Sequence, residues 1–412
     1  MLCAYFLQAE MMISREKRLL ILLIEAGLPN PEFDAGSRAL IDFIDIIKSG
    51  SGPESPNVHF LSMGHNSWGR ESDLLERNVQ IHAPQIEFLS TDGQGIWLDA
   101  IAPDIVVISR PEPAIRWLST VKGRKANKLG TKFFYYGHDI HYQRLGQQLG
   151  FNSHPALERK QRFYKVAEHA IWDCFSVVIY GSKTECNHVN KIFPNKAVYL
   201  PLYITREKTR HPQMAANVKN TVPVMLWVGG AHHAPNRDGL SWLIKEIFSR
   251  IDASLVLSVV GNWPVEFRQG IDYQPSKGNH EVRWLAQLEQ SQLENAYQTC
   301  DFAVATLRFG AGVKGKVFEA IARKCPVITT PIGAQGLEHL DWPELFLRHA
   351  SAQAVAESLE CLLKIQPRTQ FENELQSMQS VLIHESKLAP LVWSALICSN
   401  RDFIAGILRE SC

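Results

Sequence analysis

Two glycine-rich turns hold most of the residues that could do chemistry. The first lies in residues 226–239, where Gly229 and Gly230 end an apolar run and Arg237 follows. The second lies in residues 306–320, where three glycines, two lysines and a glutamate separate another apolar run from a helical pattern. The start of a helix has unpaired backbone N–H groups that attract anions, and glycine lets a ligand approach the backbone closely. Both turns could therefore hold a phosphate or a diphosphate.

The second turn places two cations where a helix disfavours them. Lys314 and Lys316 stand at the positive end of the predicted helix, where each cation costs roughly 0.3–1 kcal/mol. A diphosphate beside Gly312 and Val313 would offset that cost, whereas the alternative is a solvated turn with two exposed lysines. Glu319, one turn further, either complements the helix dipole or forms a two-pronged hydrogen bond to the vicinal hydroxyls of a ribose. Its spacing from the turn favours the ribose.

The first turn offers further polar side chains. Arg237 could pair with phosphate oxygens in a forked geometry. For Asn236 we expect the commoner role of capping the helix that follows. His232 and His233 suggest a metal, but no third ligand follows at a useful spacing, so we assign them to a loop. We expect no metal site.

A third turn lies near the start of the chain. Gly36 stands between the first predicted strand and its helix, so its backbone could approach a donor phosphate or an acceptor. Asp34 or Ser37 would cap that helix at the same time.

The elements that must position these turns are strands and helices in alternation. Continuous apolar strands joined by helices are typical of a parallel sheet that is covered on both faces. A polar stretch divides the alternation in two, so we predict an α/β protein with two Rossmann-like domains and ligands at the carboxyl ends of the strands. The predicted parts are a tail at 1–17, a first domain at 18–202, a linker at 203–221, a second domain at 222–385 and a C-terminal helix at 386–412, with its helical pattern over 390–408.

The composition excludes several classes of protein. The chain has 412 residues, with 43 basic against 42 acidic residues, and this balance does not support a nucleic-acid binder. Its 8 cysteines form no C-x-x-C pair, so we expect neither a zinc site nor disulfides, and a reducing, cytoplasmic compartment. We find no run of about 20 apolar residues that would span a membrane. The basic and aromatic run at 158–165 could bind an anionic or lipid-linked acceptor, but we favour a solvated helix face.

Together with residues 326–337, the two glycine-rich turns resemble the family 4 (group 1) retaining glycosyltransferases of the GT-B fold. The resemblance is strong over residues 222–340 and weaker in the first domain. It implies that the two Rossmann-like domains face each other across a cleft, with the donor on the second domain, and that the C-terminal helix returns to the first domain.

The resemblance also implies roles for individual residues. Glu319 would hold the donor ribose, and Arg237 and Lys316 would grip the diphosphate. His138, at the end of a predicted strand in the first domain, is either structural or contacts the transferred sugar, and the family pattern favours the sugar. Many relatives carry a glutamate where this chain has Ala311. Because of that difference, the identity of the donor sugar stays open, and we expect the backbone of residues 312–314 to contact the sugar instead.

The implied reaction transfers a sugar from a nucleoside diphosphate to an acceptor hydroxyl with retention, by a front-face route and without a metal or resident cofactor. The acceptor would be a glycan, a lipid-linked glycan or a small molecule, in glycan or polysaccharide synthesis in the cytoplasm. A peripheral contact with the inner face of the membrane stays open. The alternatives are a nucleotide-sugar epimerase and a non-catalytic subunit that binds nucleotide sugars.

Overall fold

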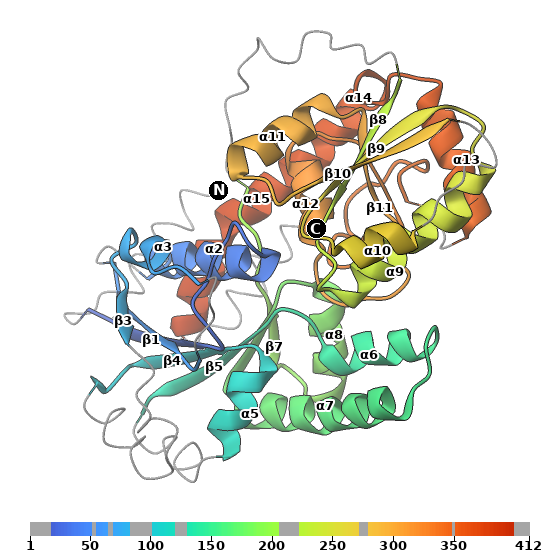
Figure 1. Cartoon of the computed structure of the whole chain (residues 1–412). Helices are drawn as coiled ribbons and strands as arrows, with labels where there is room; N and C mark the ends of the chain where they lie inside the picture. Colours follow the sequence, from blue (N-terminus) through green and yellow to red (C-terminus); the bar gives the residue numbers. More distant parts are fainter. Residues whose placement is uncertain are drawn as a thin grey trace. The chain divides into compact units, whose positions relative to one another are not determined.

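The computed structural model describes residues 18–51, 55–64, 69–82, 101–119, 130–205, 222–271, 279–347 and 351–398. The chain divides into two compact units, which Figure 1 shows in colours that follow the sequence. Unit 1 contains the residues before Thr205 together with those from His384 onward, and unit 2 contains residues 205–383. The predicted tail and most of the predicted linker lie outside the described residues.

Unit 1 is built on a seven-stranded parallel sheet in the order β3-β2-β1-β4-β5-β6-β7. The strand order reverses between β1 and β4, which is where open α/β sheets bind ligands. The central strands are buried apolar runs with helices on both faces. Their bounds are β1 Leu20–Glu25, β2 Asn57–Ser62, β3 Gln80–His82, β4 Ile105–Ser109, β5 Lys132–Gly137, β6 Val177–Tyr180 and β7 Ala197–Tyr199.

The helices of unit 1 begin at residues that satisfy their first amides. Asp34 caps the helix after β1, as predicted, because its carboxylate accepts from the Ser37 amide at 2.9 Å. Ser182 caps the helix after β6 in the same way. The helices are α2 Ala35–Ser49, α3 Ser72–Leu75, α5 Pro111–Ser119, α6 His141–Leu149, α7 Pro155–Cys174 and α8 Lys183–Ile192.

Unit 2 is built on a five-stranded parallel sheet in the order β10-β9-β8-β11-β12. The strands are β8 Val224–Val228, β9 Leu255–Val260, β10 His280–Leu285, β11 Phe302–Ala305 and β12 Val327–Thr329. The helices are α9 Ala234–Trp242, α10 Val265–Gly270, α11 Gln290–Thr299, α12 Gly315–Ala322, α13 Ala352–Leu363 and α14 Pro367–Gln370. Two parallel-sheet units confirm the predicted fold class.

The last helix, α15 (Glu372–Ile397), begins in unit 2 and ends in unit 1 (Figure 1). The side chain of Trp393 is fully buried in unit 1, where its indole N–H donates to Ser51 Oγ at 3.0 Å and its ring meets Phe43 edge-on. The predicted return of the C-terminal helix to the first domain is confirmed. The helix is longer than the predicted segment at 386–412, because α15 begins at Glu372 and contains Pro390 in its interior. Residues 399–412 of that segment lie outside the described residues.

Of the helices in these ranges, none combines the length and the apolar character that a membrane span needs.

Candidate active site

The loop between β11 and α12 is held in shape by Lys314. Its ammonium turns back into the loop and donates to the carbonyls of Ala311 at 2.9 Å and Gly312 at 2.6 Å, and to Gln335 Oε1 at 3.2 Å. The residue is only 8% exposed. Gly312 adopts φ +69°, a conformation that other residues rarely take. Lys314 therefore stabilises the turn, while Val313 beside it is partly exposed.

Lys316 lies in the first turn of α12 and has different surroundings. Its ammonium donates to Asn236 Oδ1 at 2.7 Å and lies over the ring of Trp227, 4.5 Å from the centroid. The pKa of this amine is lowered to about 7. Loss of solvent around the amine is the largest cause, the charge of Lys314 acts in the same direction, and Glu319 opposes the shift.

The turn after β8 lies against the same ammonium. Gly229 has φ +140°, and a Cβ on it would come 2.8 Å from Lys316 Nζ and 2.7 Å from Asn236 Nδ2. The Asn236 amide donates to the carbonyl of Gly230 at 2.9 Å. The predicted capping role of Asn236 is wrong, because His233 occupies the cap position and the Asn236 side chain joins the two glycine-rich turns instead.

Glu319 is held by Tyr297, a residue that no sequence motif singles out. The buried phenol of Tyr297 lies 3.3 Å from Glu319 Oε2 and 3.2 Å from the carbonyl oxygen of Lys316. Arg323 covers the Tyr297 ring and donates to the backbone of Glu319 at 3.0 Å. Unit 2 thus brings together Gly229, Gly230, Gly312, Lys314, Lys316 and Glu319. Arg237 is exposed, and its guanidinium donates to the carbonyl of Ala231 at the edge of this group.

In unit 1, His138 lies at the carboxyl end of β5. Its Nε2 is 3.2 Å from Ser109 Oγ at the end of β4. Burial lowers the pKa of His138 well below its ordinary value, and the neighbouring Arg110 lowers it further, so the imidazole is neutral at physiological pH.

Arg110 is a second residue that the sequence did not single out. It adopts φ +69° at the end of β4, where its guanidinium pairs with the buried Glu25 at 3.0 Å and lies 4.0 Å from Asp34. A Cβ on Gly36 would come 2.3 Å from Arg110 Nη2, so the glycine leaves room for the guanidinium at the start of α2.

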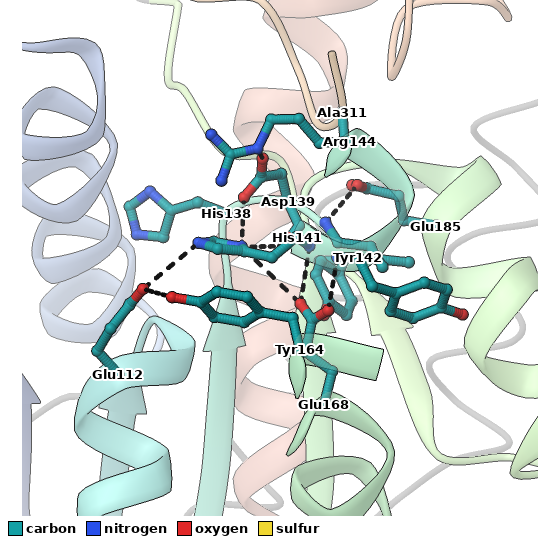
Figure 2. A network of polar contacts seen from close by, with 12 residues as sticks. Glu112, His138, Asp139, His141, Tyr142, Arg144, Tyr164, Glu168, Glu185 and Ala311 are labelled. Carbon is teal, nitrogen blue, oxygen red and sulfur yellow. Dashed lines mark hydrogen bonds and ion pairs between the residues drawn. The ribbon is translucent and has the colours of Figure 1, made fainter. Parts of the chain in front are cut away.

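Asp139, the residue after His138, belongs to a separate polar network (Figure 2). Its carboxylate pairs with His141 Nδ1 at 2.9 Å and with Arg144 Nε at 2.9 Å. The buried Glu168 of α7 accepts from the amides of His141 at 2.8 Å and Tyr142 at 3.0 Å, the first two of α6. Burial raises the pKa of Glu168 to about 7, and the charge of Asp139 raises the pKa of His141 against the effect of burial. The network fixes the start of α6.

Within the described ranges, no group of three or more His, Cys, Asp or Glu side chains is placed to hold a metal ion.

Comparisons with known proteins agree with this architecture. Residues 222–364 match the family model described as Glycosyl transferases group 1. No curated protein sequence matches the chain. Among solved structures, a sucrose-phosphate synthase from Thermosynechococcus elongatus is 14% identical, with a TM-score of 0.64 over 96% of this chain and 100% of that one.

Two further structures cover nearly the whole chain. HepE from Anabaena, in complex with UDP-glucose, is 13% identical, with a TM-score of 0.62 over 95% of this chain and 100% of that one. The apo form of WaaB, a lipopolysaccharide outer core galactosyltransferase, is 14% identical, with a TM-score of 0.55 over 94% of this chain and 99% of that one.

The fold is therefore that of the GT-B glycosyltransferases. Unit 2 carries a group 1 glycosyltransferase domain, which confirms the family resemblance seen in the sequence.

Proposed function

We propose that this protein transfers a glycosyl group from a nucleoside diphosphate sugar to an acceptor hydroxyl, with retention at the anomeric carbon. The observation that carries the proposal is the junction of Lys316, Asn236 and the Gly229–Gly230 turn at the start of α12. There a partly buried amine lies at the start of a helix in a group 1 glycosyltransferase domain, and the start of a helix attracts anions.

The donor diphosphate would bind to the first amides of α12 and to Lys316. Glu319, one turn further along the helix, would accept hydrogen bonds from the two ribose hydroxyls. Arg237 would leave the Ala231 carbonyl for a phosphate oxygen, because a charge-assisted bond to phosphate is stronger than one to a neutral carbonyl. The backbone of Gly312 and Val313 would contact the sugar.

In the transfer step, the acceptor oxygen bonds to the anomeric carbon as the bond to the diphosphate breaks. Negative charge then grows on the leaving phosphate, and Lys316 and the helix amides stabilise it; such preorganised charge stabilisation is usually the largest catalytic effect. In the front-face route the leaving phosphate takes the acceptor proton, which requires no carboxylate nucleophile. Neutral His138 would donate or accept a hydrogen bond at the transferred sugar, and Gly36 would line the site.

The acceptor would be a glycan, a lipid-linked glycan or a small molecule of a polysaccharide pathway in the cytoplasm.

On α7, one stripe of exposed side chains is formed by Arg159, Arg162, Phe163 and Val166. A basic and apolar stripe suits the surface of an anionic membrane, so the peripheral contact stays a prediction. Co-sedimentation with anionic lipid vesicles tests it, and protein left entirely in the supernatant would contradict it.

A panel of nucleotide sugars, starting with UDP-glucose, tests the reaction. We expect one donor to raise the melting temperature and to release its nucleoside diphosphate faster when an acceptor is present. Because Lys316 and the helix amides supply the positive charge, turnover should persist in excess chelator. An isomerised donor without diphosphate release would instead indicate an epimerase, and binding without release would indicate a non-catalytic subunit. Turnover that stops in chelator and returns with magnesium or manganese would contradict metal independence.

A further inference from the structure

Asn236 joins the two glycine-rich turns of unit 2 with both ends of its amide. The side chain is buried, its Nδ2 donates to the carbonyl of Gly230 at 2.9 Å, and its Oδ1 lies 2.7 Å from Lys316 Nζ. Its partners fix the orientation of the amide, because the opposite orientation would place two N–H groups against an ammonium and an oxygen against a carbonyl.

Lys316 has no anion beside it. Among the residues that the structure describes, no carboxylate forms an ion pair with its amine, and its contacts are a neutral amide oxygen and an indole face. Lys314 adds a second positive charge nearby, from the loop before α12. The nearest acidic influence is Glu319 on α12, which contacts the Tyr297 phenol of α11.

The remaining charged neighbour does not supply a negative charge either. Arg237 on α9 is itself a cation, and it turns to the carbonyl of Ala231. A partly buried amine without a carboxylate partner holds its proton weakly, and the pKa of about 7 for Lys316 agrees with this environment. About half of the molecules then carry a neutral Lys316 at pH 7.

We propose that Asn236 is a positioning residue, which holds Lys316 ready in a site without an anion of its own, and that the donor diphosphate binds together with one proton. The inference rests on the proposed function, since it concerns the same diphosphate site. The neutral amine takes up a proton from solvent as the diphosphate arrives. The diphosphate supplies the negative charge that the site otherwise lacks. The proton returns to solvent when the nucleoside diphosphate leaves. Affinity for the diphosphate should therefore fall as the pH rises above about 7.

Isothermal titration calorimetry of the full chain measures this proton directly. UDP, GDP and ADP are titrated at pH 8, where their phosphates are already ionised, in HEPES and in Tris buffers. The two buffers differ in ionisation enthalpy, so proton uptake appears as a difference in the observed heat. We expect uptake of about 0.9 proton per bound nucleotide at pH 8 and little at pH 6, since the amine titrates near pH 7.

Variants distinguish the contributions of Lys316 and Asn236 to proton uptake and to binding. Lys316→Met should abolish the uptake. Asn236→Asp places a carboxylate beside the amine, so Lys316 should be charged beforehand, with uptake near zero and at least tenfold weaker binding. Asn236→Ala should weaken binding but keep the uptake, since the amine still lacks an anion. Lys364→Ala removes an exposed lysine elsewhere in unit 2 and should change neither quantity.

The outcomes keep the inference and the proposed function apart. Nucleotide that binds to the wild-type protein with the same heat in both buffers would overturn the inference and leave the function standing. Uptake that persists in Asn236→Asp would overturn the role of Asn236. No binding of any nucleoside diphosphate at either pH would remove the support for the proposed function itself. The wild-type titration decides the main point even if a variant fails to fold.

Discussion

Lys314 and Lys316 lie two residues apart, and the fold gives their amines opposite surroundings. Lys314 is surrounded by three oxygens, of which one comes from Gln335. Lys316 has one amide oxygen and an indole face. The loop residues alone predicted both lysines at the phosphate, and only the family resemblance selected Lys316. Their spacing could not separate them, because the difference depends on how the loop turns its carbonyls inward.

At the residue scale we expect substitutions of Lys316 and Glu319 to change different kinetic constants. Lys316→Ala should chiefly lower kcat, because its charge matters most as the diphosphate leaves. Glu319→Ala should chiefly raise the donor KM, because ribose contacts are equal in the ground and transition states. A charge-assisted hydrogen bond contributes roughly 1.5–3 kcal/mol, so each variant should lose at least tenfold in kcat/KM.

Steady-state kinetics with the donor found in the panel check this prediction. Lys364→Ala serves as the control for loss of a lysine charge in unit 2, and it should keep wild-type values. Wild-type kcat and KM in both site variants would mean that the donor binds elsewhere.

Two of the residues at the candidate sites could not be found by spacing. Tyr297 reaches Glu319 from α11, 22 residues earlier in the chain, and its position is simply that of a buried helix residue. Arg110 acquires its role from a left-handed backbone at the end of β4 and from the buried Glu25 of β1. The roles of both residues depend on packing between elements, which a sequence motif does not reveal.

At the scale of elements, strands with uninterrupted apolar runs were predictable, including the edge strands β7 and β12, whereas the edge strands β3 and β10 were missed. β10 reads His-Glu-Val-Arg-Trp-Leu and alternates between buried or half-buried and exposed residues, because it lies at the edge of its sheet. α15 was missed over its first half because a proline is typical of the first turn of a helix, whereas Pro390 lies in the interior of this one.

The start of α6 makes unit 1 sensitive to pH through Glu168. Its folded pKa of about 7 lies above the ordinary value of 4.5, so the folded state binds the proton more tightly. Its contribution to stability is full below pH 4.5 and is lost as the pH rises through about 7. We expect the free energy of unfolding to fall by roughly 1–3 kcal/mol between pH 5 and pH 8, and Glu168→Gln to flatten this slope.

Urea denaturation at several pH values measures the slope. Glu158→Gln changes a carboxylate on the same helix whose side chain is 43% exposed, and it should keep the wild-type slope. The assignment to Glu168 would fail if Glu168→Gln retained the full pH dependence. His141 would then be the group to examine, because its raised pKa gives a dependence of the same sign.

At the scale of the whole molecule, two parallel-sheet units and a returning helix were predicted from the alternation of elements and the family resemblance. The observed division falls after Ile204 and after Ile383. Composition and charge alone indicated only the size class and a balanced net charge.

The returning part of α15 should be essential to unit 1. Trp393 is fully buried and contacts Phe43 and Phe134, so Trp393→Ala should destabilise unit 1 by roughly 3–5 kcal/mol. Hydrogen exchange followed by mass spectrometry should show faster exchange in the strands of unit 1 and unchanged exchange in those of unit 2. Gln376→Ala, at an exposed position earlier in the same helix, is the control. Equal acceleration in both units would contradict a separate core.

The place of α15 in the chain also determines when unit 1 can be completed on the ribosome. Its sheet is synthesised by residue 199, yet the helix that closes its core comes only from residue 384 onward. At 5–20 residues per second, the intervening stretch takes roughly 10–40 s to translate. The nascent unit 1 therefore waits with an uncovered apolar face until residues 384–397 have emerged. Unit 2, which is continuous in the chain, is the unit that can fold first.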